Sequence, residues 1–329
     1  FIRASLVSIE PSTGYVKAWV GGIDHDHFAF DHIKQGKRQI GSAMKPFTYG
    51  AAFSMGVIEP CMELNQEAYC VDPCDPSGRR WCPSGTPSRS LKSQFAQQSG
   101  STSVPVISLM GSCSGPQTVA EILKRMNIEI PDNQVVPSIC LGTPDVSLFE
   151  FTAANAMFVN NGIFIGPQTI RRIEDKHGNV IYTSKVVPRE VLNSMCSYDV
   201  LQMMKGVVTA GTSTSLRWHK KWGGILHPTA GKTGTTQGNA DMWYFGLTPD
   251  LVTGVWTGGE DKQVRFRSMT WGQGARGSLP IYGYYMQQVY ADSSLNISTE
   301  DFAAPATYPP GRFNCEDEKS GEPNPFGLR

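Results

Sequence analysis

A serine and a lysine three residues apart, Ser42 and Lys45, form the pair in this sequence best suited to nucleophilic chemistry. A serine hydroxyl is a poor nucleophile at neutral pH and needs a base beside it. On a helix, residues three apart lie on one face, so the Lys45 amine can reach the Ser42 hydroxyl. Gly41 suits a helix start, where free N–H groups and the helix dipole favour a developing oxyanion. The pair therefore predicts acyl transfer through Ser42; the non-catalytic alternative is a capped helix with an exposed lysine.

A second ammonium and two hydroxyls follow in the segment Lys232-Thr233-Gly234-Thr235, whose flanking pattern predicts a strand. Thr233 and Thr235 share one face by the strand period of two, and with Lys232 they can hold a carboxylate. Gly234 on an edge strand lets a substrate backbone approach closely. Burial beside the Lys232 cation would lower the pKa of Lys45, as a base requires. The alternative is a polar edge strand whose lysine guards against aggregation.

A third short motif lies between these two, and its register stays open. One register is Ser101-Thr102-Ser103, and the other is Ser99-Gly100-Ser101. Either register places two hydroxyls near the middle of the chain, and each motif alone is weak because short patterns recur by chance.

The elements that must position these residues are predicted from periodicity and turn residues. Strands are expected at residues 4–9, 15–20, 170–173 and 180–182, with three more between residues 227 and 259. Helices are expected at residues 42–55, 104–111, 117–127, 147–161, 198–208 and 281–290. Strands at both ends with helices between them predict an α+β fold, an antiparallel sheet flanked by helices. Residues 1–295 are expected to form one domain, and residues 296–329 an extended tail.

The composition excludes several function classes. The chain has 329 residues, with 29 Lys plus Arg against 29 Asp plus Glu, so it carries no basic excess for nucleic acid or anionic lipid. It contains no apolar run of about 18 residues that would span a membrane. It also lacks a leading basic stretch followed by an apolar segment, the pattern of a signal peptide.

Half of the eight cysteines fall in one short segment rich in Pro, Gly and Asp. The four are Cys61, Cys70, Cys74 and Cys82, whereas Cys113, Cys140, Cys196 and Cys315 are scattered. An oxidising compartment would allow one or two disulfides within the segment, and its four cysteines admit three pairings. A zinc site is the alternative, but the spacings do not form two short CxxC knuckles.

Two further patterns have weak functional readings. Residues 272–277 match G-x-G-x-x-G, but no βαβ unit surrounds them, so we interpret them as a loop before the last helix. Residues 24–27 (DHDH) with His32 offer metal ligands, although a solvated loop is the simpler interpretation. Neither a metal nor a cofactor is expected.

The longer blocks around these motifs resemble the transpeptidase domain of class A penicillin-binding proteins, across roughly residues 4–290. The S-x-x-K, S-x-N-like and K-T-G set is the one that β-lactamases and penicillin-binding proteins use. Residues 38–47 (RQIGSAMKPF) resemble the family's R-Q-P-G-S-x-x-K-P-F block, and residues 137–147 (PSICLGTPDVS) its P-S-x-x-L-G-x-x-x-V-S segment. Residues 230–236 (AGKTGTT) and 241–249 (DMWYFGLTP) resemble A-G-K-T-G-T-T and D-x-W-F-x-G-x-T-P. The resemblance implies a serine β-lactamase/D,D-peptidase-like fold.

The resemblance also implies a peptidoglycan D,D-transpeptidase. Such an enzyme attacks the D-Ala–D-Ala end of a stem peptide, releases D-Ala, and passes the acyl group to an amine on a neighbouring stem. The matching positions place the nucleophile at Ser42 and the base at Lys45. Ser101 would shuttle a proton together with Lys232. β-Lactams would acylate Ser42 because they mimic the D-Ala–D-Ala amide.

The same carry-over assigns substrate contacts. Ser103, Thr233, Gly234 and Thr235 would bind the substrate, with the two threonines holding its carboxylate. The backbone N–H groups of Ser42 and Thr235 would form the oxyanion hole. Ser103 stands where the family has Asn, which removes one amide contact worth typically about 0.5–1.5 kcal/mol. Weakened or altered substrate binding is the expected result.

The family's context sets the remaining expectations. Its membrane helix and glycosyltransferase domain would lie before Phe1, on the periplasmic face of a bacterial inner membrane, with other cell-wall synthesis proteins as partners. One alternative function uses water as acceptor, giving a D,D-carboxypeptidase or β-lactamase. The other is a non-catalytic penicillin-binding sensor or scaffold, which the missing Asn favours.

Overall fold

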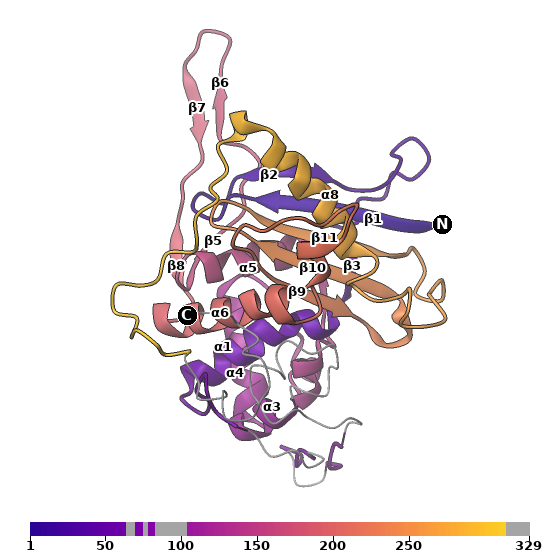
Figure 1. Ribbon diagram of the computed structural model, residues 1–329, viewed down its shortest axis with the longest axis vertical. Coiled ribbons are helices and arrows are strands. Elements are labelled where there is room, and N and C mark those ends of the chain that lie inside the picture. The colour runs from indigo at the N-terminus through magenta and orange to yellow at the C-terminus, as the bar shows by residue number, and fades with distance from the viewer. Residues whose placement is uncertain (64–69, 75–77, 83–103, 314–329) are drawn as a thin grey trace.

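A computed structural model describes residues 1–63, 70–74, 78–82 and 104–313, and its centre is a five-stranded antiparallel sheet (Figure 1). The strand order is β2-β1-β11-β10-β9, so the start of the chain pairs with a strand near its end. The strands are β1 (Ile2–Ile9), β2 (Val16–Val20), β9 (Ala230–Thr235), β10 (Asp241–Leu247) and β11 (Val252–Gly259). The hairpin and the three-strand run predicted from the sequence are thus the two parts of one sheet.

Helices cover both faces of this sheet. One face carries α5 (Leu148–Val159) and α6 (Ser194–Ala210), and α1 (Lys45–Ser54) packs against α6. The other face carries α8 (Ser278–Ala291), which crosses β10 and β11 (Figure 1). Because both faces are covered, every residue of β10 and β11 is buried. The predicted α+β class, an antiparallel sheet flanked by helices, is confirmed.

Smaller elements complete the architecture. The helices α3 (Val104–Met110) and α4 (Ser114–Arg125) pack with α1 in a lobe beside the sheet, and α7 (Ser215–Trp218) follows α6. Two-stranded pairs are made by β3 (Lys37–Gln39) with β4 (Asp145–Ser147), β5 (Ile163–Ile165) with β8 (Pro188–Glu190), and β6 (Arg172–Glu174) with β7 (Val180–Thr183). The 3-10 turns are η1 (Gly41–Met44), η3 (Asp132–Gln134), η4 (Pro137–Leu141), η5 (Gln237–Asn239) and η6 (Ser293–Leu295).

One disulfide closes a loop within the cysteine-rich segment, and another joins this segment to the lobe of α3 and α4. Cys70 pairs with Cys82, and Cys74 pairs with Cys113. The expectation that the bridges stay within residues 61–82 was therefore wrong for Cys74. Its partner, Cys113, directly precedes α4. The two cysteines are far apart in the sequence, so their spacing does not show that they meet in space. Cys61 is also disulfide-bonded.

The chain after residue 295 packs back onto α6. Arg312 makes a two-pronged ion pair with the fully buried Asp199, at 2.8–3.0 Å, and the Tyr308 hydroxyl donates to the same carboxylate at 2.6 Å. Phe302 and Phe313 join the main hydrophobic core. The division of the chain at residue 295 stays a prediction.

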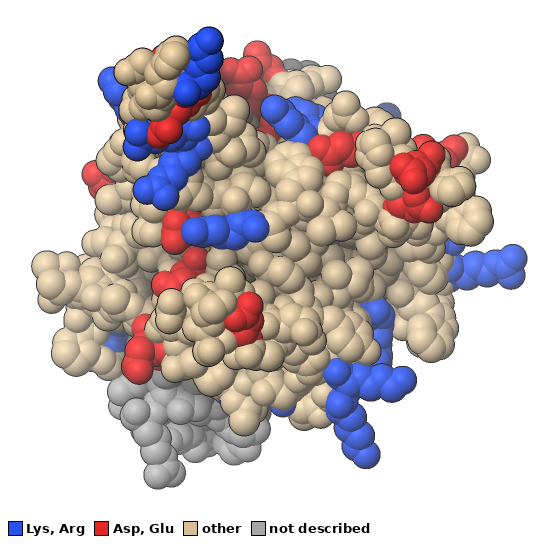
Figure 2. Space-filling model, turned by 90° about the horizontal axis from the view of Figure 1, so that it is seen from above, with Lys and Arg blue, Asp and Glu red and all other residues tan. Residues whose placement is uncertain are grey.

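The surface in Figure 2 carries small groups of acidic and basic side chains separated by uncharged surface. This face, as far as the structure describes it, has no extended basic stripe of the kind that follows a nucleic-acid backbone. Within residues 1–63, 70–74, 78–82 and 104–313, no helix combines the length and apolarity needed to cross a membrane. In the same ranges, no three His, Cys, Asp or Glu side chains gather as metal ligands would.

Candidate active site

Ser42 and Lys45 lie one turn apart where η1 runs into α1. Ser42 belongs to the 3-10 turn, Lys45 is the first residue of α1, and the Lys45 N–H donates to the Ser42 carbonyl. The sequence predicted a single α-helix from residue 42. The structure begins it with a 3-10 turn, whose three residues per turn place side chains three apart directly in line. Both side chains are buried, Ser42 at 6% exposure and Lys45 at 0%.

Close backbone packing holds this turn against strand β9. Gly41 has φ +56°, and a Cβ there would lie 2.3 Å from the Thr235 carbonyl oxygen. Its N–H donates to the Gly142 carbonyl at 3.2 Å, and a Cβ on Gly142, which has φ +74°, would lie 2.1 Å from the Gly41 oxygen. Only glycine combines the left-handed conformation with this proximity. The two glycines thus hold the turn that carries Ser42 against β9.

Gly234 packs closely against the segment around Ser42. A Cβ at Gly234 would lie 2.4 Å from the Ile40 carbonyl oxygen and 3.1 Å from the Ala43 Cβ. A side chain at position 234 would therefore collide with the segment that runs from Ile40 to Ala43, and only glycine fits there. Its contact with a substrate backbone stays a prediction.

The two lysines of the motifs are both fully buried. Burial lowers the pKa of Lys232 to about 7. Burial, and after it the nearby Lys232 ammonium, lowers the pKa of Lys45 well below 10.5. A neutral amine beside a serine hydroxyl can accept its proton, so the electrostatics suit Lys45 to the work of a base.

Strand β9 forms an edge of the sheet and leaves one side open. Among the described residues its only ladder is with β10, and the Thr236 N–H donates toward that neighbour, to the Asp241 carbonyl, at 3.1 Å. Because N–H directions alternate along a strand, the Thr235 N–H points away from β10, to the open side. That side is where Gly41 packs and Ser42 follows. The direction suits the Thr235 amide to an oxyanion hole.

The hydroxyls of Thr233 and Thr235 both have partners outside the strand. The Thr233 hydroxyl lies 2.7 Å from the Thr212 hydroxyl, and the Thr235 hydroxyl accepts from the Gly274 N–H at 3.1 Å. Thr233 is only 4% exposed, and Thr235 is half-buried. The sequence did not single out Thr212. Gly274 belongs to the G-x-G-x-x-G pattern, which is indeed the loop before α8.

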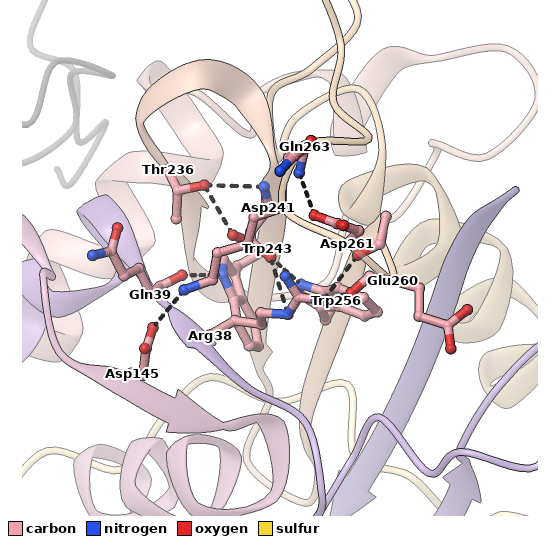
Figure 3. A network of polar contacts seen from close by, with 12 residues as sticks. Arg38, Gln39, Asp145, Thr236, Asp241, Trp243, Trp256, Glu260, Asp261 and Gln263 are labelled. Atoms are coloured by element: carbon pink, nitrogen blue, oxygen red, sulfur yellow. Dashed lines mark hydrogen bonds and ion pairs between the residues drawn. The ribbon is translucent and has the colours of Figure 1, made fainter.

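A polar network surrounds the buried Asp241 carboxylate and includes Arg38 and Gln39, which precede Ser42 in the chain (Figure 3). The Asp241 carboxylate accepts from the Trp256 indole at 3.1 Å and from the Thr236 hydroxyl at 3.1 Å, and lies 3.9 Å from Arg38. The Trp243 indole donates to the Gln39 carbonyl at 2.8 Å. Burial raises the pKa of Asp241, although these partners oppose the rise. The network joins the segment before Ser42 to strands β10 and β11.

The structure thus brings together most of the predicted site residues. Ser42, Lys45, Lys232 and the β9 residues meet at one edge of the sheet. Ser101 and Ser103, in either register of the middle motif, lie outside the described residues. Their assigned roles stay predictions.

Comparison with known proteins identifies the family. A family model described as the penicillin-binding protein transpeptidase domain matches residues 4–253. Penicillin-binding protein 1A of Aquifex aeolicus is 30% identical over 311 residues, which is 92% of this chain and 40% of that protein. The protein of the same name from Neisseria lactamica is 28% identical over 293 residues, 87% of this chain and 36% of that one. The chain therefore spans about two fifths of the length of these relatives.

Solved structures show the same fold. Penicillin-binding protein 1A of Haemophilus influenzae superposes with a TM-score of 0.78 at 22% identity, covering 93% of this chain and 49% of that one. PonA1 of Mycobacterium tuberculosis, in complex with penicillin V, gives a TM-score of 0.72 at 24% identity, covering 93% and 82%. With the family match over most of its length, the chain belongs to the transpeptidase domains of class A penicillin-binding proteins.

Proposed function

We propose that this domain is a serine D,D-transpeptidase that cross-links peptidoglycan stem peptides through an acyl-enzyme on Ser42. The observation that carries the proposal is the buried Ser42–Lys45 turn seated on a strand edge that presents Lys232. The pKa values of both buried lysines are lowered, and perturbed pKa values of this kind cluster at catalytic sites, which supports the proposal.

The first half-reaction forms the acyl-enzyme. Neutral Lys45 takes the Ser42 proton as the oxygen attacks the carbonyl carbon of the D-Ala–D-Ala bond, and the amides of Ser42 and Thr235 stabilise the oxyanion. Collapse of the tetrahedral intermediate breaks the C–N bond. Ser101, working with Lys232, delivers a proton to the leaving D-Ala nitrogen, and the Ser42 ester remains.

The second half-reaction transfers the acyl group. An amine of a neighbouring stem peptide attacks the Ser42 ester and gives a proton to the Ser101 and Lys232 pair, while Lys45 returns its proton to the Ser42 oxygen as the ester C–O bond breaks. The new peptide bond forms, and Ser42 regains its proton. Thr233 and Thr235 bind the carboxylate of the departing D-Ala during the first step, through hydrogen bonds that the ionised acceptor strengthens.

The proposed site also binds β-lactams, which acylate Ser42 in place of the stem peptide. A penicillin V complex of the structurally similar PonA1 supports this part of the proposal. We propose that the domain works in cell-wall synthesis, at the periplasmic face of a bacterial inner membrane and among other wall-building proteins. Its similarity to two proteins named penicillin-binding protein 1A supports this setting.

The serine at the Asn position of the middle motif favours one competing function, a sensor that binds penicillin or stem peptide without turnover.

The decisive experiment incubates the wild-type chain and S42A with benzylpenicillin and maps the adduct by mass spectrometry. We expect one adduct on Ser42 that persists for hours, and none on S42A.

Turnover separates the remaining functions. Release of D-Ala from a pentapeptide or thioester substrate together with a new amide supports the transpeptidase, whereas release to water alone indicates a carboxypeptidase. Loss of the penicillin adduct within minutes indicates a β-lactamase. A stable adduct without D-Ala release indicates the sensor, and an unlabelled Ser42 refutes acyl transfer altogether.

A further inference from the structure

The two threonine hydroxyls of strand β9 are each contacted by a loop from outside the sheet. Thr212, in the loop between α6 and α7, lies 2.7 Å from the Thr233 hydroxyl oxygen to oxygen. Gly274, in the loop before α8, donates its N–H to the Thr235 hydroxyl at 3.1 Å. The proposed function assigns a role to both β9 threonines but none to these two loops.

The Gly274 contact fixes which way the Thr235 hydroxyl points. A hydroxyl carries one proton and two lone pairs, and a backbone N–H can only donate. The contact therefore occupies a lone pair of Thr235 and leaves its single proton for another acceptor. The position of Gly274 is fixed on its other side, because its carbonyl accepts from the Ser278 and Leu279 N–H groups at 3.2 and 2.9 Å, at the start of α8.

The same loop approaches β9 so closely that only glycine fits. A Cβ on Gly274 would lie 2.3 Å from the Trp243 carbonyl oxygen and 2.6 Å from the Gly234 carbonyl oxygen. This explains the second glycine of the G-x-G-x-x-G pattern as a packing requirement beside the site. It also holds the donor in place behind Thr235.

Thr212 gives the Thr233 hydroxyl a hydrogen-bond partner, as Gly274 does for Thr235, but this hydrogen bond can run in either direction. Either hydroxyl of the pair can donate. A bound carboxylate only accepts hydrogen bonds, so it favours the state in which Thr212 donates to Thr233 and Thr233 donates to the carboxylate. Donors in such a chain polarise one another, which strengthens the terminal bond.

We propose that Thr212 is a positioning residue that turns the Thr233 hydroxyl proton toward the carboxylate of the ligand, as the Gly274 peptide does for Thr235. The site then selects ligands that carry a carboxylate beside the reacting amide over neutral analogues. This inference rests on the proposed acylation of Ser42 and deepens it by naming what sets its anion specificity.

The test compares one ligand with and without its negative charge. The second-order rate constant for acylation is measured by mass spectrometry with benzylpenicillin and with its methyl ester, for wild type, T212V and T212S. T212V should acylate about 3–10-fold more slowly with the acid and less than about 2-fold more slowly with the ester, the range expected for one lost hydroxyl contact. T212S, which keeps the hydroxyl, should restore the rate with the acid.

A matched control is T214V, which removes a half-buried hydroxyl two residues along the same loop. We expect it to leave both rates unchanged. Equal slowing of acid and ester by T212V, or no slowing of either, overturns the inference while leaving the proposed function intact. A wild-type chain that benzylpenicillin does not acylate refutes the proposed function itself, and the two failures are therefore distinguishable.

Discussion

Replacing Lys232 with methionine should make the protein more stable while abolishing acylation. The Lys232 side chain has 0% exposure, and its pKa falls from 10.5 to about 7 because burial disfavours the ammonium. A fall of this size corresponds to about 5 kcal/mol of unfavourable free energy when the group is charged in both states. Methionine has a similar length and fills the same space without a charge.

The sign of the pH dependence follows from the protons that each state binds. Between about pH 7 and 10.5, the unfolded chain keeps Lys232 protonated while the folded chain does not. The unfolded state then binds more protons, so the free energy of unfolding rises with pH across this window. The gain from K232M should therefore be about 4 kcal/mol at pH 7 and about 2 kcal/mol at pH 9.

The assay is urea-induced unfolding of wild type and K232M at both pH values, with penicillin acylation measured in parallel. Lys220→Met, an exposed lysine, is the matched control and should change the free energy of unfolding by less than about 0.5 kcal/mol. A K232M protein that is less stable than wild type at pH 7, or whose gain does not shrink by pH 9, refutes the reasoning about a buried, destabilised amine.

Three further predictions concern the packing at Gly234, the Cys74–Cys113 disulfide and the pKa of Lys45. G234A places a Cβ about 2.4 Å from the Ile40 oxygen, so we expect a lower melting temperature and slower acylation, seen by calorimetry and penicillin labelling. The double alanine variant of Cys74 and Cys113 removes a disulfide that spans 39 residues. Its free energy of unfolding, measured in urea titrations, should fall by about 4 kcal/mol. Since Lys45 must be neutral to act as base, the acylation rate should rise with pH and level off well below pH 10.5, and a pH–rate profile still rising there contradicts the assignment.

The sequence predicted the elements that carry Ser42, Lys45 and Lys232 because these elements follow local patterns. The spacing of Ser42 and Lys45 puts the two side chains in line on any helical turn, and the 3-10 turn observed keeps this relation. The alternation around Lys232 predicted a strand, and β9 is an edge strand as expected. The direction of the Lys45 pKa change also followed from burial beside a second cation.

What the sequence could not predict are contacts between segments far apart in the chain. Thr212 meets Thr233 only because the loop after α6 returns to β9, and no local pattern marks that approach. Cys113 meets Cys74 for the same kind of reason. Arg38 and Asp241 stand within blocks that resemble the family, but their proximity depends on how β3 lies against β10.

The glycines of the site belong to local motifs and also make contacts between segments that are far apart in the chain. Gly41, Gly234 and Gly274 belong to three separate motifs, and each lacks a side chain where another backbone passes within the reach of a Cβ. Their shared effect is to bring the turn that carries Ser42, strand β9 and the loop before α8 into direct backbone contact. Backbone contacts vary less in position than flexible side chains do, so a site built this way can hold two buried lysines in an unfavourable environment without letting either escape to solvent. The lowered pKa values of the two lysines therefore depend on the close packing at these glycines, because the pKa values stay low only while the packed backbones exclude water.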